Sequence, residues 1–113
     1  MNVQIFGTKK NFDSKKAERY FKERGIKYQF VDMKEKGLSK GEFHSVCQAV
    51  GGYEKLIDPK CKDKNLLALI QYLSEEDKKE KILENQKIIR TPIVRNGKQA
   101  TVGYEPDVWK DWK

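Results

Sequence analysis

The first 32 residues switch twice between the two periods of regular secondary structure, and this order constrains the fold more than any other feature. Residues 2–6 alternate apolar and polar side chains, which predicts a short strand. Apolar residues recur at helical spacing over 13–24, with Asp13 as the expected N-cap and Gly25 as the residue that ends the helix. Residues 27–32 alternate again, so two parallel strands joined by a right-handed helical crossover are predicted.

The centre of the chain, about residues 39–86, is predicted to be a helical insert. Ser39-x-x-Glu42 is a capping box, and it opens a helix that Gly51-Gly52 ends. Apolar residues at helical spacing between 66 and 73 mark a second helix. Ser74 and the three acidic residues after it open a third, since acids stabilise the positive end of a helix.

The last third of the chain predicts a β-hairpin and a short helix. Two apolar runs, 92–95 and 99–102, flank Asn96-Gly97, a dipeptide typical of tight hairpin turns. Residues 105–112 begin with Glu-Pro and are expected to form a helix. Together the segments predict one α/β domain over residues 1–113, with a mixed four-stranded sheet and helices against its faces. This is the thioredoxin-like arrangement.

Positive charge is concentrated near the N-terminus. The chain has 24 Lys and Arg against 17 Asp and Glu, a formal net charge of +7. Residues 1–30 alone contain eight basic and three acidic residues. Such a surface attracts a small oxyanion, glutathione carboxylates, RNA or an acidic protein, although a solvated lysine-rich face gives the same pattern.

Composition excludes several classes of protein. Two cysteines are too few for a disulfide framework, and a single histidine allows neither a metal cluster nor a histidine-based triad, so no metal is expected. No apolar stretch approaches the roughly 18 residues that span a membrane, and no leader-like segment precedes the first strand. We therefore expect a cytoplasmic protein with no membrane partner.

Three blocks of sequence carry a family resemblance: Ile5-Phe-Gly-Thr-Lys-Lys-Asn-Phe-Asp-Ser-Lys-Lys-Ala17, Gly37-Leu-Ser39-x-x-Glu42-Phe43, and Arg90-Thr-Pro-Ile-Val94 with Gly97-Lys98 and Val102-Gly-Tyr104. They resemble the arsenate reductase (ArsC) family, which also includes the Spx-type transcriptional regulators. The resemblance extends over nearly the whole chain, and it implies the same thioredoxin-like fold.

The family places a reactive cysteine in the loop after the first strand, at the N-terminus of the first helix. Unpaired backbone N–H groups and the positive helix end lower a thiol pKa and hold an oxyanion there. By the resemblance, Asn11 occupies this position. An amide cannot attack arsenic or form a mixed disulfide, so the chain lacks the nucleophile that the family chemistry uses.

The resemblance also implies three oxyanion-binding arginines, and this chain departs from that pattern. The corresponding positions lie near Asp58, at Thr91 and near Gly103. Arg90 is one residue before the pre-proline position, so its side chain is expected to point to the opposite side of an extended segment. Thr91-Pro92 itself resembles the thioredoxin-fold turn, typically cis, whose backbone pairs with an extended thiol peptide.

The candidate ligand-binding residues therefore lie in the first loop and in this turn. They are Thr8, Lys9, Lys10, Asn11, Arg90, Thr91 and Pro92. No cofactor is expected; glutathione is a candidate ligand or co-substrate, and a small oxyanion is an alternative.

The two cysteines are expected to differ. Cys47 lies on the apolar stripe of its helix and is expected to pack in the core, whereas His44 next to the stripe is expected to face solvent. Cys61 lies between Lys60 and Lys62, which favour the thiolate, and it is the alternative nucleophile.

Three functions follow. The first is a non-catalytic or atypical relative that binds glutathione, an anion or a protein partner. The second is a glutathione- or glutaredoxin-linked reductase that uses Cys61. The third is an Spx-like regulator that acts through protein contacts. Direct nucleic-acid binding is not expected, because aromatics such as Tyr20 and Tyr28 have the spacing of core residues.

Overall fold

Four strands of the computed structural model, which describes residues 1–112, form one mixed sheet in the order β2-β1-β3-β4. β1 is parallel to β2, whereas β3 is antiparallel to both β1 and β4. The strands are β1 (Val3–Gly7), β2 (Tyr28–Asp32), β3 (Ile93–Asn96) and β4 (Gln99–Val102). The predicted mixed four-stranded sheet is confirmed.

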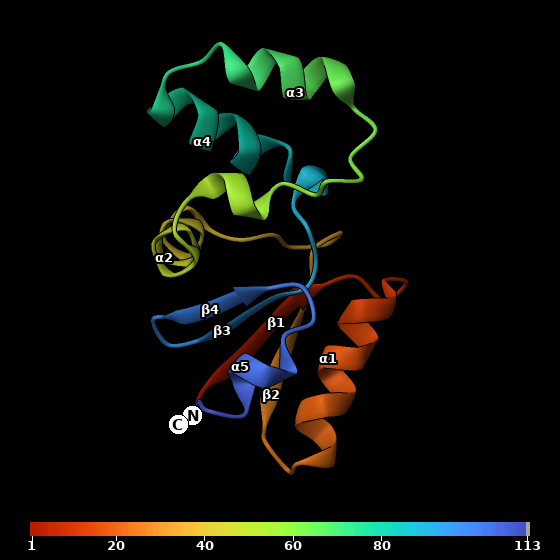
Figure 1. Cartoon of the computed structure of the whole chain (residues 1–113). Helices are drawn as coiled ribbons and strands as arrows, with labels where there is room; N and C mark the ends of the chain where they lie inside the picture. The colour runs from red at the N-terminus through yellow and green to blue at the C-terminus, as the bar shows by residue number, and fades with distance from the viewer. Residues whose placement is uncertain (113) are drawn as a thin grey trace.

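Helices cover both faces of this sheet (Figure 1). The crossover helix and the last helix pack on one face, and the first helix of the insert packs on the other; the remaining insert helices lie beyond it. They are α1 (Phe12–Glu23), α2 (Lys40–Val50), α3 (Lys64–Gln71), α4 (Glu75–Glu84) and α5 (Pro106–Trp109), with the short 3-10 helices η1 (Tyr53–Leu56) and η2 (Gln86–Ile88). The fold is thioredoxin-like. No helix within residues 1–112 is long and apolar enough to cross a membrane.

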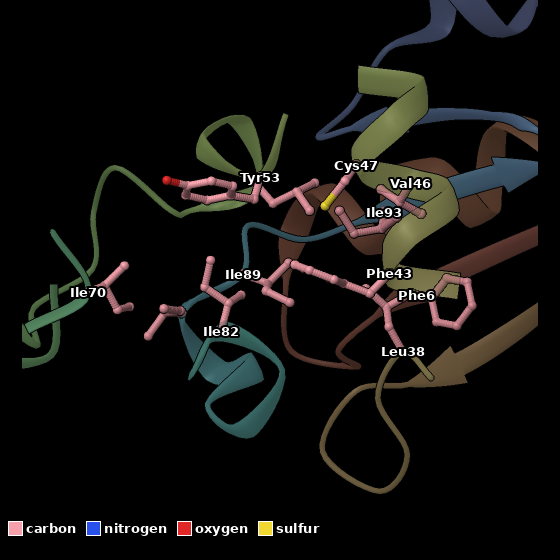
Figure 2. Packing of buried hydrophobic residues seen from close by; sticks show 12 residues of the cluster. Phe6, Leu38, Phe43, Val46, Cys47, Tyr53, Ile70, Ile82, Ile89 and Ile93 are labelled. Carbon is pink, nitrogen blue, oxygen red and sulfur yellow. The ribbon is translucent and has the colours of Figure 1, made fainter. Parts of the chain in front are cut away.

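Alternation along the central strand β1 divides the core between the two faces. Val3 and Ile5 contribute to the cluster under α1 and α5, whereas Phe6 contributes to the cluster under α2. The second cluster continues from the sheet into the insert, where Ile70 and Ile82 are buried with it (Figure 2). The insert therefore shares a buried cluster with the sheet.

Trp109 attaches the C-terminal helix to the sheet. Its side chain is 2% exposed and packs on Tyr20 and Phe21, with ring centroids 5.2 and 5.1 Å away. The indole Nε1 donates a hydrogen bond to Thr101 Oγ1 at 2.7 Å. A buried N–H donor without an acceptor destabilises the folded state. Any displacement of α5 that broke this hydrogen bond would therefore be unfavourable.

Two local predictions were wrong by a small shift. α1 begins at Phe12 with Asn11 as its N-cap, not with Asp13, because the Asn11 side chain accepts the cap hydrogen bond. In the hairpin, Asn96 pairs with Gln99 inside the ladder, so the turn is Gly97-Lys98 instead of Asn96-Gly97. The φ of +62° at Gly97 suits the first position of a type II′ turn, which glycine occupies without steric cost.

The buried Trp109–Thr101 bond can be tested by mutation. Thr101→Val is expected to lower the free energy of unfolding by about 1–3 kcal/mol, because it leaves the indole N–H unsatisfied. Thr101→Ser, which keeps the hydroxyl, is the matched control, and its free energy of unfolding is expected to fall by less than that of Thr101→Val. Urea unfolding measures both, and equal losses in the two variants would argue against the bond.

Candidate ligand-binding site

A chain of three hydrogen bonds shapes the loop between β1 and α1. Asn11 Oδ1 accepts from the backbone N–H of Ser14 at 2.7 Å and from Ser14 Oγ at 2.9 Å. Ser14 Oγ in turn accepts from the Thr8 N–H at 3.3 Å. The Asn11 amide oxygen thus caps the helix and orients Ser14. These bonds hold the loop at the positive N-terminal end of α1.

Small side chains allow this close approach of loop and helix. Ser14 is fully buried, and a Cβ at Gly7 would overlap its hydroxyl group. A larger residue at either position would therefore push the start of α1 away from the end of β1.

The Thr91–Pro92 peptide bond is cis, as expected from the resemblance. The turn is held from both sides: the Pro92 carbonyl accepts from Gly103 N at 2.8 Å, and Arg90 N donates to the Leu56 carbonyl at 2.7 Å. The turn therefore connects the sheet to the end of η1.

The loop after η1 is brought to the same place by a short antiparallel contact. Ile57 bridges Ile89, and Asp58 N donates to the Ile88 carbonyl at 2.8 Å. The Asp58 carboxylate accepts a hydrogen bond from the Lys60 N–H at 2.9 Å, and this bond restricts the orientation of the Asp58 side chain.

These segments enclose a cavity of about 430 Å³. It brings together three residues that the sequence singled out: Thr8, Asp58 and Thr91. Five others were not predicted: Met33, Lys34, Gln86, Lys87 and Ile89. Its volume is in the usual range for sites that bind small molecules.

The sequence contained an indication that one of these unpredicted lining residues, Lys34, lies at the site. Lys34 follows β2, and the carboxyl ends of the parallel strands β1 and β2 lie at one edge of the sheet, where α/β folds commonly bind ligands. Gln86 offered no such signal. It reaches the site because its amide donates to the Leu38 carbonyl at 2.8 Å and accepts from Leu38 N at 2.7 Å, 48 residues away.

The charges that line the cavity are two cations and one acid. Lys34 and Lys87 are exposed; Lys87 lies 3.9 Å from Asp63, a contact that contributes little at the surface. Asp58 is half-buried. Among the described residues that line the cavity there is no thiol or imidazole, so the lining supplies no nucleophile of those kinds.

The remaining candidates lie elsewhere. Lys9 and Lys10 are exposed in the turn after Thr8 and are not among the residues that line this cavity, nor is Asn11. Pro92 is buried in the turn. The Arg90 guanidinium lies against Gly103 and lines a separate cavity, on the side opposite to Thr91, as an extended backbone predicts.

The two cysteines also lie outside the cavity lining. Cys47 is buried in the cluster under α2, as predicted, and burial raises the pKa of its thiol (Figure 2). Cys61 is half-buried and packs against the same cluster. His44 is exposed. Within residues 1–112, no three His, Cys, Asp or Glu side chains are grouped as metal ligands.

The N-cap gives a sharp prediction. Asn11→Ala is expected to lower the free energy of unfolding by about 1 kcal/mol, whereas Asn11→Asp keeps the acceptor and is expected to retain stability. Asp13→Ala serves as the control within the same turn, and it is expected to lower the free energy of unfolding by less than Asn11→Ala does. If urea unfolding showed that Asn11→Ala and Asn11→Asp are equally destabilised, the capping role of the Asn11 side chain would be wrong.

Thiol labelling tests the difference between the cysteines. With a chromogenic disulfide reagent at neutral pH, Cys61 is expected to react in the folded protein and Cys47 only after unfolding, because burial disfavours the Cys47 thiolate. Cys61→Ser is therefore expected to abolish the native-state reaction and Cys47→Ser to leave it. Rapid labelling of the Cys61→Ser protein would contradict this.

Solved structures of known proteins share this fold. An ArsC family related protein from Bacteroides fragilis is 19% identical, with a TM-score of 0.86 over 100% of this chain and 98% of that chain. An arsenate reductase from Vibrio cholerae is 25% identical, with a TM-score of 0.82 over 96% and 94%. The Staphylococcus aureus protein SACOL0876 is 23% identical, with a TM-score of 0.80 over 96% of both chains.

A search of curated proteins gave no match. The model of the ArsC family, however, matches residues 6–112, nearly the whole sequence and all of the site described above. The chain therefore belongs to the ArsC family.

Proposed function

We propose that this chain is a non-catalytic member of the ArsC family that binds glutathione, or a closely related thiol peptide, without redox turnover. One observation carries the proposal: the cavity between the α1 loop and the Thr91–Pro92 turn presents charged groups for a small zwitterion but no lining thiol. The Asn11 side chain, at the position that the resemblance gives to the nucleophile, is used as a helix cap.

The charges of the cavity complement those of glutathione. The tripeptide carries two carboxylates and one ammonium group, and the cavity offers two lysines, Lys34 and Lys87, and one carboxylate, Asp58. The Asp58 carboxylate would repel a small oxyanion, because both are negatively charged. It would attract the ammonium group of a γ-glutamyl residue. A zwitterionic ligand is therefore favoured over a small oxyanion.

The turn offers backbone groups to an extended ligand. Among the described residues, neither the N–H nor the carbonyl of Thr91 makes a hydrogen bond. An extended peptide placed beside Thr91 could pair with both groups, as a strand pairs with a sheet edge. The ligand would then lie along the turn, with its charged ends toward the lysines and Asp58.

The position of Cys61 makes a reductase the weaker candidate. Covalent turnover needs a thiol within reach of the ligand sulfur, and Cys61 packs against the core cluster instead of lining the cavity. A role as an Spx-like regulator stays a prediction. A cytoplasmic location fits the proposal, since two free thiols and reduced glutathione belong to a reducing compartment.

An NMR titration tests the proposal. Reduced glutathione is expected to shift the amides of Thr8, Lys34, Asp58 and Thr91. S-methylglutathione, which has no free thiol, is expected to bind with the same affinity, because the site uses only charge and backbone contacts.

Charge variants give the controls. Lys34→Gln and Lys87→Gln are each expected to weaken binding about two- to fivefold, as for an exposed ion pair. Lys98→Gln, which removes an exposed lysine in the hairpin turn, is expected to bind normally. The proposal fails if millimolar glutathione shifts no amide at the cavity. It also fails if only the free thiol binds and Cys61→Ser abolishes that binding, which would favour the reductase.

A further inference from the structure

The free edge of β4 is a separate feature, and the glutathione proposal does not use it. β4 is the last strand in the order β2-β1-β3-β4, so within the described chain it pairs only with β3. An edge strand leaves half of its backbone groups without a partner, and these can bind another extended chain.

The register shows which groups face the open edge. Ile93 is opposite Val102, and the next hydrogen bond runs from Gly103 N to the Pro92 carbonyl. In an antiparallel ladder this makes Ile93 and Val102 a non-hydrogen-bonded pair. The N–H and carbonyl groups of Val102, and by the same alternation those of Ala100, therefore point away from β3.

The strand that carries these outward groups also lines a groove. A cavity of about 390 Å³ is lined by residues 100–102 of β4, by Val50 at the end of α2 and by Val108 of α5. Val108 is 42% exposed although it is apolar. Val50 and Val108 reach the groove from opposite faces of the sheet, since α2 and α5 lie on opposite faces (Figure 1). The groove thus combines β4 with apolar side chains from both faces.

The charges in the groove are unequal. Lys55 and Arg90 both line it and are exposed, and neither forms an ion pair with a described residue. Glu105 is the one acidic residue among the described residues of the lining. A ligand that carries a carboxylate is therefore favoured, and Arg90, which the sequence singled out, has its place here.

The strand is short, at four residues, which is one form of edge protection, but it carries few of the others. Natural edges are commonly blocked by charged residues, proline or a bulge, but Gln99–Val102 contains no charged residue and no proline, and its pairing with β3 is regular. An edge that has no charge, proline or bulge and that lines a groove can accept an extended peptide as an added strand.

We propose that the β4 edge binds an extended segment of a partner protein as a fifth strand, with an acidic side chain of that segment beside Arg90 and Lys55. Backbone hydrogen bonds to Ala100 and Val102 would supply affinity, and the charge and the two valines would supply selectivity. This site is distinct from the cavity at Thr91.

The test uses a panel of capped hexapeptides that alternate Val and Thr, with one Asp moved through the sequence. Added to the ¹⁵N-labelled protein, at least one peptide is expected to shift the amides of Ala100 and Val102. The same peptide with N-methyl groups on the hydrogen-bonding amides is expected not to bind, because its side chains are unchanged but those amides can no longer pair with the strand edge.

Protein variants separate the contributions. Ala100→Pro removes an outward N–H without breaking the ladder to β3, so it is expected to abolish binding while the NMR fingerprint stays folded. Arg90→Gln is expected to weaken binding of the Asp peptide about two- to fivefold, and Lys98→Gln, outside the groove, is expected to have no effect.

Three results would overturn the proposal. One is that no peptide of the panel shifts Ala100 or Val102. Another is equal binding by the N-methylated peptide, which would show that backbone pairing is not used. The third is a dimer in sedimentation that Ala100→Pro dissociates, because the edge would then serve a second copy of this chain.

Discussion

The two-sided pairing of β1 is the interaction on which the rest of the structure depends. β2 pairs with it in parallel and β3 pairs with it antiparallel, so this short strand is hydrogen-bonded along both edges. Its alternating side chains supply both core clusters. The same pairing places the loop after β1, the loop after β2 and the turn before β3 at one end of the sheet, and the candidate cavity lies there.

A second set of contacts joins the insert to this frame. Residues 56–58 pair with residues 88–90, and the Gln86 amide holds the loop at Leu38. The insert thus contributes Asp58 and Gln86 to the lining of the cavity, and Lys87 follows directly after it. Because the insert shares its buried cluster with the sheet, its packing and the shape of the site are coupled.

The start of α1 shows how one location can serve different purposes. A helix N-terminus stabilises an anion or a thiolate, and it also needs a cap. Asn11 fulfils the second need, with its oxygen accepting two hydrogen bonds from Ser14. Under the proposed function, this use of the helix N-terminus as a cap is compatible with binding without turnover. The β4 edge is a second surface, which we propose binds an extended segment of a partner protein.

Local patterns were sufficient for the elements and their order. Period-two and helical spacing located the strands and helices, Ser39 and Ser74 were recognised as caps, and the Gly97 region was recognised as a hairpin, although its turn is one residue later than predicted. Capping and alternation depend on neighbours within a few residues, so the sequence by itself determined them. It also placed Thr8, Asp58 and Thr91 near one another, through the resemblance. Only the tertiary structure decided that Lys34, Gln86 and Lys87 complete the cavity and that Arg90 faces the β4 groove, because these positions follow from hydrogen bonds and packing between segments tens of residues apart.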